Sequence, residues 1–295
     1  MLRASRRAFA ALAILALAAC SSQGGRAGDA RKAAAEAGPA MTVAFITHAA
    51  PGDTFWDIVR KGAEAAAAKD NVVLRYAADP DGGAQATLVQ NAIDSKVDAI
   101  AVTLAKPAAL DAVVRKARAA GEEAGRRAAA DGAKHVLCVS QEQGHVALEA
   151  RCDGLRRGFA PGRADKVYVL GTDMPSVRST IAAKLRQDPS IDLVVTLGAP
   201  FGITAVEVAR DVGSRAKVAT FDTNPQVPAA IRSGALQWAI DQQPYLQGYL
   251  AVDSLWLFRS NGHIIGGGRP VLTGPYFVDG SNIAQISAFA ARGTR

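Results

Sequence analysis

Histidine and cysteine are scarce in this sequence, and neither is spaced as a metal site requires. There are four histidines and three cysteines among 295 residues. His48, His135, His145 and His263 share no ligand spacing with the cysteines, so we predict no metal site. No Ser/His/Asp arrangement is visible, and the three glycines at 266–268 are not followed by a helix, as a phosphate loop requires. We therefore expect no enzyme activity and no cofactor.

Runs of basic residues are also absent. The formal net charge is +7, and three of the positive charges, Arg3, Arg6 and Arg7, lie in a leader that we expect to be removed. The mature chain would then carry about +4, spread along its length. Without a Lys/Arg run interleaved with aromatics, nucleic acid is not an expected partner. A composition of 49% hydrophobic and 21% charged residues indicates a globular chain with one large or two medium domains.

The first twenty residues have the pattern of a bacterial export leader. The three arginines precede an apolar run, residues 8–16, which is too short to span a membrane as an ordinary helix. Residues 17–20, Leu-Ala-Ala-Cys, resemble the lipoprotein processing box, in which small residues allow cleavage and the cysteine thiol is lipidated. We predict a signal peptide over 1–19 and lipidation of Cys20. The alternative is an ordinary secretory signal with a chance cysteine.

Residues 5–9, Ser-Arg-Arg-Ala-Phe, also look like a twin-arginine signal, and the choice of export route stays open. Residues 21–39 are rich in Gly, Ala, Ser and charge and show no strand periodicity. We predict that 20–40 form the lipidated cysteine and a flexible tether. The expected location is extracytoplasmic, with the protein attached to the cell membrane only through Cys20.

The two remaining cysteines, Cys138 and Cys152, sit in a chain expected to be exported to an oxidising compartment. A disulfide between them would close a short loop over a strand and the start of the next helix. Two buried thiols are the alternative.

Short apolar runs alternate with helical periods along the rest of the chain. The first helix, for example, carries Phe55, Ile58, Val59, Gly62, Ala63 and Ala66 on one face. The pattern predicts an α/β fold with two doubly wound parallel-sheet lobes. Expected strands are 43–47, 72–77, 98–104, 135–140, 166–170, 191–197, 216–221 and 235–240, with a last strand pair near 270–278. Helices are expected after the first three strands, near 145–158, 176–187, 201–212 and 225–233, and up to Arg259.

The turn at 53–57, Asp-Thr-Phe-Trp-Asp, follows the first expected strand. Aromatic faces pack on the C–H face of a sugar ring and a carboxylate accepts from paired hydroxyls, so Asp53, Phe55 and Trp56 form a candidate sugar site. The alternative is that the two aromatics simply begin the helix and pack into the core.

Five motifs, in order, resemble those of the periplasmic-type solute-binding proteins of the simple-sugar class, relatives of ribose-, galactose- and xylose-binding proteins. The resemblance covers roughly 41–290, and LacI-type repressors share the core but begin with a helix-turn-helix where this chain has a lipoprotein leader. The motifs are 50–56, a polar residue before two aromatics; 94–102, a helix–strand step; 151–155, similar to Arg-x-x-Gly-Phe; 220–222, a strand-end Phe-Asp; and 239–244, a hinge Gln-x-Pro.

The resemblance implies two lobes joined by a hinge, with the ligand trapped between them at the carboxyl ends of the strands. It places Asp53, Phe55 and Trp56 on the first lobe's side of the ligand. It places four residues on the side of the second lobe and the hinge: Arg151, Met174, Asp222 and Gln242.

Other roles stay open for three of these residues. Arg151 could be a surface helix residue, and Gln242 could serve only the hinge. Asp222 could cap the helix expected near residue 225, because Asp-x-Asn-Pro is good turn chemistry.

The sequence between the third expected strand and residue 131 is only helix-like, where relatives have a further strand, a ligand-contacting turn and a lobe crossover. We predict an internal deletion of roughly 30 residues at Gly121/Glu122. One long helix would run from about Ala108 through Ala130, with Gly121 and Gly125 as weak points. The first lobe would lack a strand, and its hinge would drop to two connections.

The expected lobes are 41–121 plus about 243–272, and 122–242 plus about 273–295. The expected function is a lipid-anchored, monomeric receptor that delivers a small sugar or polyol to an ABC importer, with the ABC permease as its partner. The alternatives are a sugar-sensing co-receptor of a membrane signalling protein, or a truncated variant impaired in binding. The sequence leaves the identity of the sugar open.

Overall fold

Two mainly parallel sheets form the framework of the computed structural model, which describes residues 41–103 and 111–295. The predicted signal peptide, Cys20 and the predicted tether lie outside these residues. Within them, no helix is both long enough and apolar enough to cross a bilayer.

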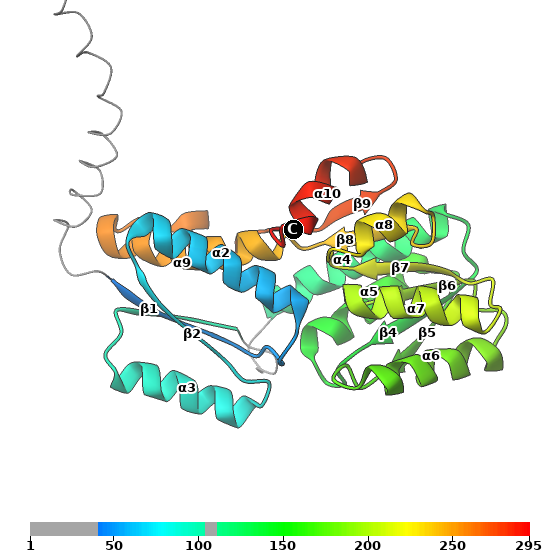
Figure 1. The fold of residues 1–295 in the computed structure, drawn as a ribbon, viewed down its shortest axis with the longest axis horizontal. Coiled ribbons are helices and arrows are strands. Elements are labelled where there is room, and N and C mark those ends of the chain that lie inside the picture. Colours follow the sequence, from blue (N-terminus) through cyan, green and yellow to red (C-terminus); the bar gives the residue numbers. More distant parts are fainter. Residues whose placement is uncertain (1–40, 104–110) are drawn as a thin grey trace, which may run out of the picture. The chain divides into compact units, whose positions relative to one another are not determined.

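The first sheet has the strand order β2-β1-β3 in the described part of the chain. Its strands are β1 (Thr42–Thr47), β2 (Val73–Ala78) and β3 (Ala99–Val102), all parallel. Its helices are α2 (Thr54–Asp70), α3 (Gly82–Asp94) and α9 (Pro244–Asn261). Figure 1 shows α2 and α9 together on one side of this sheet and α3 on the other.

Alternation along β1 explains this arrangement, because successive side chains of a strand point to opposite faces. Val43 and Phe45 pack with residues of α2 and α9, whereas Ala44 and Ile46 pack with Ala92 of α3. The strand is buried on both faces, as in other doubly wound sheets.

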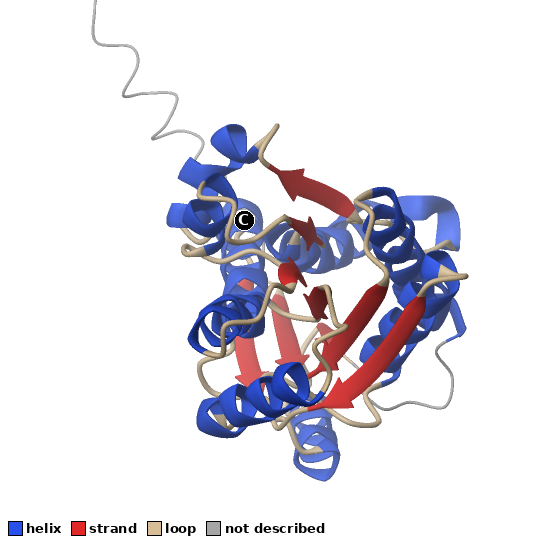
Figure 2. Ribbon diagram, turned by 90° about the vertical axis from the view of Figure 1, so that its right-hand side faces the viewer, coloured by secondary structure: helices blue, strands red, loops and turns tan. Residues whose placement is uncertain are grey.

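The second sheet has the order β5-β4-β6-β7-β8-β9, with β9 antiparallel to β8. Figure 2 shows its strands in red with helices on both sides. The strands are β4 (His135–Ser140), β5 (Arg163–Tyr168), β6 (Leu193–Thr196), β7 (Lys217–Phe221), β8 (Trp238–Asp241) and β9 (Tyr276–Asp279). The helices are α4 (Asp111–Ala130), α5 (Val146–Phe159), α6 (Met174–Gln187), α7 (Ala199–Asp211), α8 (Val227–Arg232) and α10 (Ile283–Ala291).

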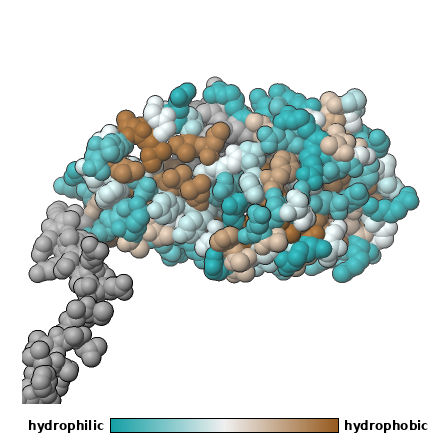
Figure 3. All heavy atoms as spheres, turned by 90° about the horizontal axis from the view of Figure 1, so that it is seen from above, coloured by the Kyte–Doolittle hydropathy of each residue, from teal (hydrophilic) through white to brown (hydrophobic). Residues whose placement is uncertain are grey.

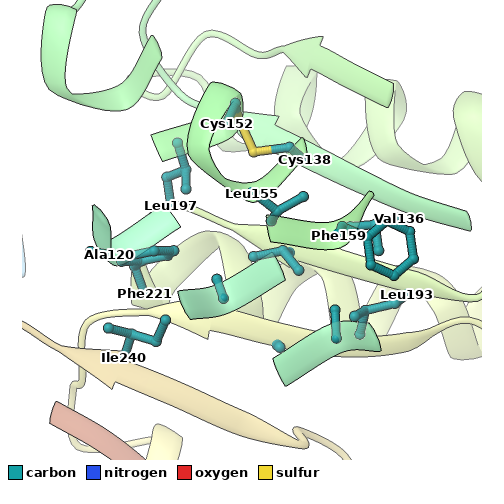
Figure 4. Close-up of a cluster of buried hydrophobic side chains, with 14 of the residues drawn as sticks. Ala120, Val136, Cys138, Cys152, Leu155, Phe159, Leu193, Leu197, Phe221 and Ile240 are labelled. Carbon is teal, nitrogen blue, oxygen red and sulfur yellow. A yellow bond between two sulfur atoms is a disulfide. The ribbon is translucent and has the colours of Figure 1, made fainter. Parts of the chain in front are cut away.

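The larger core lies between this sheet and the helix pair α4/α5. Figure 4 shows part of it, with strand residues such as Val136, Phe221 and Ile240 facing Ala120 and Leu155 of the two helices. The opposite face of the sheet packs on α6 and α7 through a separate apolar cluster.

Cys138 and Cys152 are joined in a disulfide beside this core (Figure 4). The bridge ties β4 to α5, and it is one of the two states that the sequence left open.

Helix α4 runs without interruption through Gly121 and Glu122, which confirms the expected continuous helix over its described length. That Gly121 and Gly125 weaken it stays a prediction, but the structure gives both a packing role that was not expected. A Cβ on Gly121 would lie 2.2 Å from the Arg151 carbonyl oxygen, and one on Gly125 would lie 2.3 Å from the Leu155 carbonyl oxygen. The two glycines therefore let α4 approach the backbone of α5 closely.

Two glycines on α5 allow the same close approach from the other side of the contact. A Cβ on Gly154 would lie 2.1 Å from the Arg118 carbonyl oxygen, and one on Gly158 would lie 2.1 Å from the Glu122 carbonyl oxygen. The helices of the first sheet pack in the same way. A Cβ on Gly62 of α2 would lie 1.9 Å from a backbone oxygen of α9, and a Cβ on Gly248 of α9 would lie 1.8 Å from a backbone oxygen of α2. Both helix pairs are thus set by glycine rather than by large apolar side chains.

Four expectations differ from the structure. The strand expected at 166–170 is β5 at Arg163–Tyr168, an edge strand whose polar residues hide its beginning. The last strand pair is a single strand, β9, and α10 was not expected. The hinge does not drop to two connections: among the described elements, the chain changes from one sheet to the other three times, from β3 to α4, from β8 to α9 and from α9 to β9. The number is odd because the first described strand, β1, is in the first sheet and the last, β9, is in the second.

The last turns of α9 and the segment between α9 and β9 leave large apolar side chains exposed. Phe258 of α9 is 59% exposed, and Ile264 and Leu272 of the segment are 62% and 66% exposed. Figure 3 shows apolar surface gathered on the half of the described protein that carries α9.

Candidate ligand site

Asp53 begins helix α2 as its N-cap. Its Oδ1 accepts from the backbone N–H groups of Phe55 at 3.0 Å and Trp56 at 3.4 Å. Burial raises the pKa of this carboxyl, and the two backbone donors oppose the effect. The capping role accounts for an aspartate here without a ligand, and it places the carboxylate just after the carboxyl end of β1.

Phe55 and Trp56 pack against the core, as the alternative reading of the sequence expected, and their contact with a sugar stays a prediction. Both are partly buried against the core of the first sheet, and their rings meet edge to face at 5.0 Å between centroids. The Trp56 ring also contacts the imidazole of His48, with 4.7 Å between centroids. The core therefore contacts one part of each aromatic ring, while another part remains accessible.

Arg151, Gln242 and Asp222 form one hydrogen-bonded chain in the second lobe. Arg151 Nη2 donates to Gln242 Oε1, and Gln242 Nε2 donates to Asp222 Oδ1 at 2.5 Å. The three residues come from α5, from the end of β8 and from the end of β7. The structure thus brings together three residues that are far apart in the sequence, at the carboxyl edge of a parallel sheet where ligands bind in open α/β folds.

Burial controls the electrostatics of this trio. Asp222 is 7% exposed, and burial raises its pKa to about 7, opposed by the charge of Arg151 and the hydrogen bond from Gln242. Burial also lowers the pKa of Arg151. The Arg151 guanidinium lies 5.2 Å from the centre of the Phe221 ring. A surface role for Arg151 is therefore wrong.

Capping of α8 falls to another residue. Asn224 Oδ1 accepts from the backbone N–H groups of Gln226 at 2.9 Å and Val227 at 3.0 Å. Asp222 instead adopts a left-handed backbone, with φ +66°. Its carboxylate is thereby left for Gln242, so the capping alternative is wrong for Asp222.

Met174 is the first residue of α6 and is partly buried against the apolar cluster under α6 and α7. Asp173 caps that helix by accepting from Ser176 N at 3.1 Å. Met174 therefore has a packing role in the structure, and ligand contact stays a prediction for it, as it does for the other candidate residues.

Sequence reasoning missed two site residues, His48 and His145. His48 follows β1, and its Nδ1 lies 2.7 Å from Oγ1 of Thr103, which follows β3. His145 is the N-cap of α5, and its Nε2 lies 3.4 Å from Nε2 of His48. Their positions in the loops after β1 and β4 could have indicated the site, but the histidines were considered only as possible metal ligands.

Several buried polar atoms near these strand ends have no partner within the described residues. They are Arg151 Nε, Gln141 Oε1 and Thr223 Oγ1. Gln141 follows β4 and uses its amide nitrogen on the Leu197 carbonyl at 3.2 Å. Buried polar groups are nearly always satisfied, so these atoms are suited to a hydroxyl-rich ligand or water.

One acidic group with a histidine has ligand-like geometry elsewhere, formed by His135, Asp165 and Asp188. Arg163 Nη2 lies 2.7 Å from Asp165 and 3.2 Å from Asp188, so a guanidinium already occupies the centre of charge. His135 begins β4, at the opposite edge of the sheet from Asp222 and Gln242. The group is a partly exposed ion-pair network in which only His135 is buried, and Arg163 supplies its positive charge.

Comparison with known proteins places the chain in a family. The sequence model of the periplasmic binding protein domain matches residues 43–122 and 118–260. The chain belongs to this family, and its two matched stretches meet at the predicted deletion point. No curated protein matches the chain significantly.

Among solved structures, a carbohydrate transporter from Acidothermus cellulolyticus 11B in complex with myo-inositol is 54% identical, with a TM-score of 0.83 over 87% of this chain and 100% of that one. A solute-binding protein from Actinobacillus succinogenes 130z with bound D-allose is 22% identical, with a TM-score of 0.72 over 83% and 99%. One from Burkholderia graminis C4D1M in complex with D-arabinose is 24% identical, with a TM-score of 0.69 over 82% and 96%. The last two show the fold alone.

Proposed function

We propose that this chain is the extracytoplasmic substrate-binding component of an ABC importer for a simple sugar or cyclic polyol. The observation that carries the proposal is the 54% identity to a protein solved with myo-inositol, across that protein's whole length. The polar trio and the aromatic turn are chemically suited to such a ligand. The two lobes would close around it, as hinged binding proteins do.

Each site residue has a defined part in this proposal. Arg151 offers a planar pair of donors to ring or hydroxyl oxygens, and Asp222 accepts from neighbouring hydroxyls. Gln242 is hydrogen-bonded to both Arg151 and Asp222. It would keep one of these two hydrogen bonds and position that residue while the ligand replaces the other. Phe55 and Trp56 would cover the apolar C–H face of the ring.

Calorimetric titration with a panel of pentoses, hexoses and inositols tests the proposal. We expect saturable binding of at least one cyclic polyol or sugar, and a change in Trp56 fluorescence that Trp56→Phe removes. Trp256→Phe is the matched control, because Trp256 lies on α9 and packs in the first-sheet core. Absence of binding across the whole panel would contradict the proposal.

Lipid anchoring and the permease are further parts of the proposal. Residues 17–20 support lipidation of Cys20, after which about 20 residues of tether would reach the folded part, a span of up to roughly 70 Å. We expect the intact mass of the mature protein to begin at a diacylated Cys20 and Cys20→Ser to abolish membrane retention. A wild-type protein that fractionates with the soluble pool would contradict anchoring.

A sugar-sensing co-receptor would have the same fold, so the identity of the membrane partner distinguishes it from a transport protein. Transport requires that the ligand-loaded protein stimulate the ATPase of a cognate importer, whereas a co-receptor would instead alter the activity of a membrane sensor. No observation on the described residues favours the co-receptor.

A further inference from the structure

His48 and His145 join the two sheets through their side chains. His48 follows β1 of the first sheet, and His145 begins α5 beside β4 of the second. Their Nε2 atoms lie 3.4 Å apart, and their ring centroids are 5.4 Å apart. The pair lies beside Trp56, at the carboxyl ends of the strands where the ligand is expected.

The hydrogen bonds around the pair determine where each proton sits. His145 Nδ1 accepts from the backbone N–H of Ala147 at 3.3 Å, so a neutral His145 carries its proton on Nε2. That N–H donates to His48 Nε2, which must then be the acceptor. His48 carries its own proton on Nδ1 and donates it to Thr103 Oγ1 at 2.7 Å. One pair of tautomers therefore satisfies every ring nitrogen.

An added proton breaks this chain at either ring. On His48 it would occupy Nε2 and point at the N–H of His145. On His145 it would occupy Nδ1, point at the N–H of Ala147 and place a positive charge at the N-terminus of α5, where the helix dipole disfavours cations. The contact between the lobes is consistent only with two neutral imidazoles.

The surroundings of His48 favour its neutral form. Burial and the neighbouring His145 lower the pKa of His48 to about 4, while Glu142 and the bond to Thr103 act in the opposite direction. Trp56 on α2 contributes an uncharged contact. Once the lobes separate, the pKa of His48 should return towards the ordinary histidine value of about 6.5.

We propose that His48 and His145 form a latch between the two lobes that holds only while both imidazoles are neutral, so that mild acid opens the lobes and releases the ligand. The release step rests on the proposed function. The latch itself is a property of the ligand-free protein and is tested without any ligand.

The first test is ¹⁵N NMR of the histidine side chains in the ligand-free protein. We expect the Nδ1–H tautomer for His48 and the Nε2–H tautomer for His145 at pH 8, and a larger radius of gyration by solution scattering at pH 4 than at pH 8. An Nε2–H tautomer for His48, or a radius that does not change with pH, would overturn the latch.

The second test titrates myo-inositol at pH 8 and pH 5.5. With a pKa for His48 of about 6.5 when the lobes are apart and about 4 when they are in contact, the affinity for myo-inositol should be about tenfold lower at pH 5.5 than at pH 8. Asp222 also titrates in this range, so the readout is the difference between the wild-type protein and His48→Gln, whose amide does not titrate. His263→Gln is the matched control, because His263 is exposed on the segment after α9.

We expect His48→Gln to lose the tenfold difference and His263→Gln to keep it. The same pH dependence in both variants would overturn the latch. If myo-inositol binds at neither pH, the choice of ligand in the proposed function fails, and the ligand-free experiment still decides on the latch.

Discussion

Gly121 packs directly on the backbone of Arg151: a Cβ on Gly121 would lie 2.2 Å from the Arg151 carbonyl oxygen. The helix that contains the predicted deletion point is thus in contact with the helix turn that presents a candidate ligand residue. Any change in the packing of α4 on α5 should be transmitted to the guanidinium.

Gly121→Ala should therefore destabilise the protein and weaken binding together. The added methyl meets backbone atoms that cannot rotate away, and overpacking of this kind costs about 1–3 kcal/mol. Thermal unfolding should shift down by several degrees, at roughly 2–4 °C per kcal/mol for a chain of this size. Gly82→Ala is the control, because a Cβ at Gly82 on α3 meets nothing within 4 Å. Equal melting of the two variants would contradict the contact.

Arg151→Lys should weaken sugar or polyol binding by about 10–100-fold, because lysine keeps the charge and loses the planar pair of donors. It would also leave Gln242 without its present donor. Calorimetry measures the effect. Arg156→Lys, an exposed arginine on the same helix, should bind like the wild type; a matching loss in that variant would mean that α5 responds to any substitution.

Asp222 should make stability fall as the pH rises. Its folded pKa, about 7, is above the ordinary value of 3.8, so the folded state holds a proton that the unfolded state releases. The contribution is full below pH 3.8 and is lost progressively up to pH 7, by at most on the order of 4 kcal/mol.

Asp222→Asn isolates this effect from other titrating groups. The free energy of unfolding of the variant, relative to the wild type, should be higher at pH 8 than at pH 4 in urea titrations. A difference that is the same at both values would show that the carboxyl titrates normally.

Cys138→Ala/Cys152→Ala should lower the free energy of unfolding. The disulfide closes a loop with a sequence separation of 14, for which chain-entropy estimates give about 3 kcal/mol. Reduction of the wild-type protein should have a similar effect, and Cys20→Ser in the mature chain should have none. Urea unfolding with and without reductant provides the comparison.

Inserting the segment that the prediction treats as missing, taken from a relative that has it, between Gly121 and Glu122 tests the predicted deletion. We expect the extended protein to melt at a higher temperature and to bind its sugar or polyol more tightly, because the first sheet has three strands and the second has six in the described chain. Equal melting and binding would mean that the gap has no consequence.

Most of the fold was accessible from sequence because its strands are buried and its helices are amphipathic. His135–Ser140 is the strand β4 at the predicted bounds. β5 was displaced because an edge strand can carry Arg163, Asp165 and Lys166 without cost. The packing role of the glycines of α4 was not predicted because helix propensity concerns a single helix, whereas their contact is with a neighbouring one.

The candidate site was only partly accessible for a different reason. Family motifs pointed to Arg151, Asp222 and Gln242, and the structure joins them. The contact between His48 and His145 spans 97 positions and depends on the approach of two lobes, which no local pattern records.

The unequal sheets give the two halves of the protein different shares of the cooperative core. β3, at one edge of the smaller sheet, has only four residues, and the buried residues of α2 and α9 in its core are mainly alanine and valine, with glycines at the helix contact. Sub-global opening should begin there, since small cores with few apolar contacts open at the lowest free energy. A ligand held between the lobes would then act as a cofactor for folding of the smaller half, and slowed amide exchange in β1 to β3 would report occupancy of the receptor.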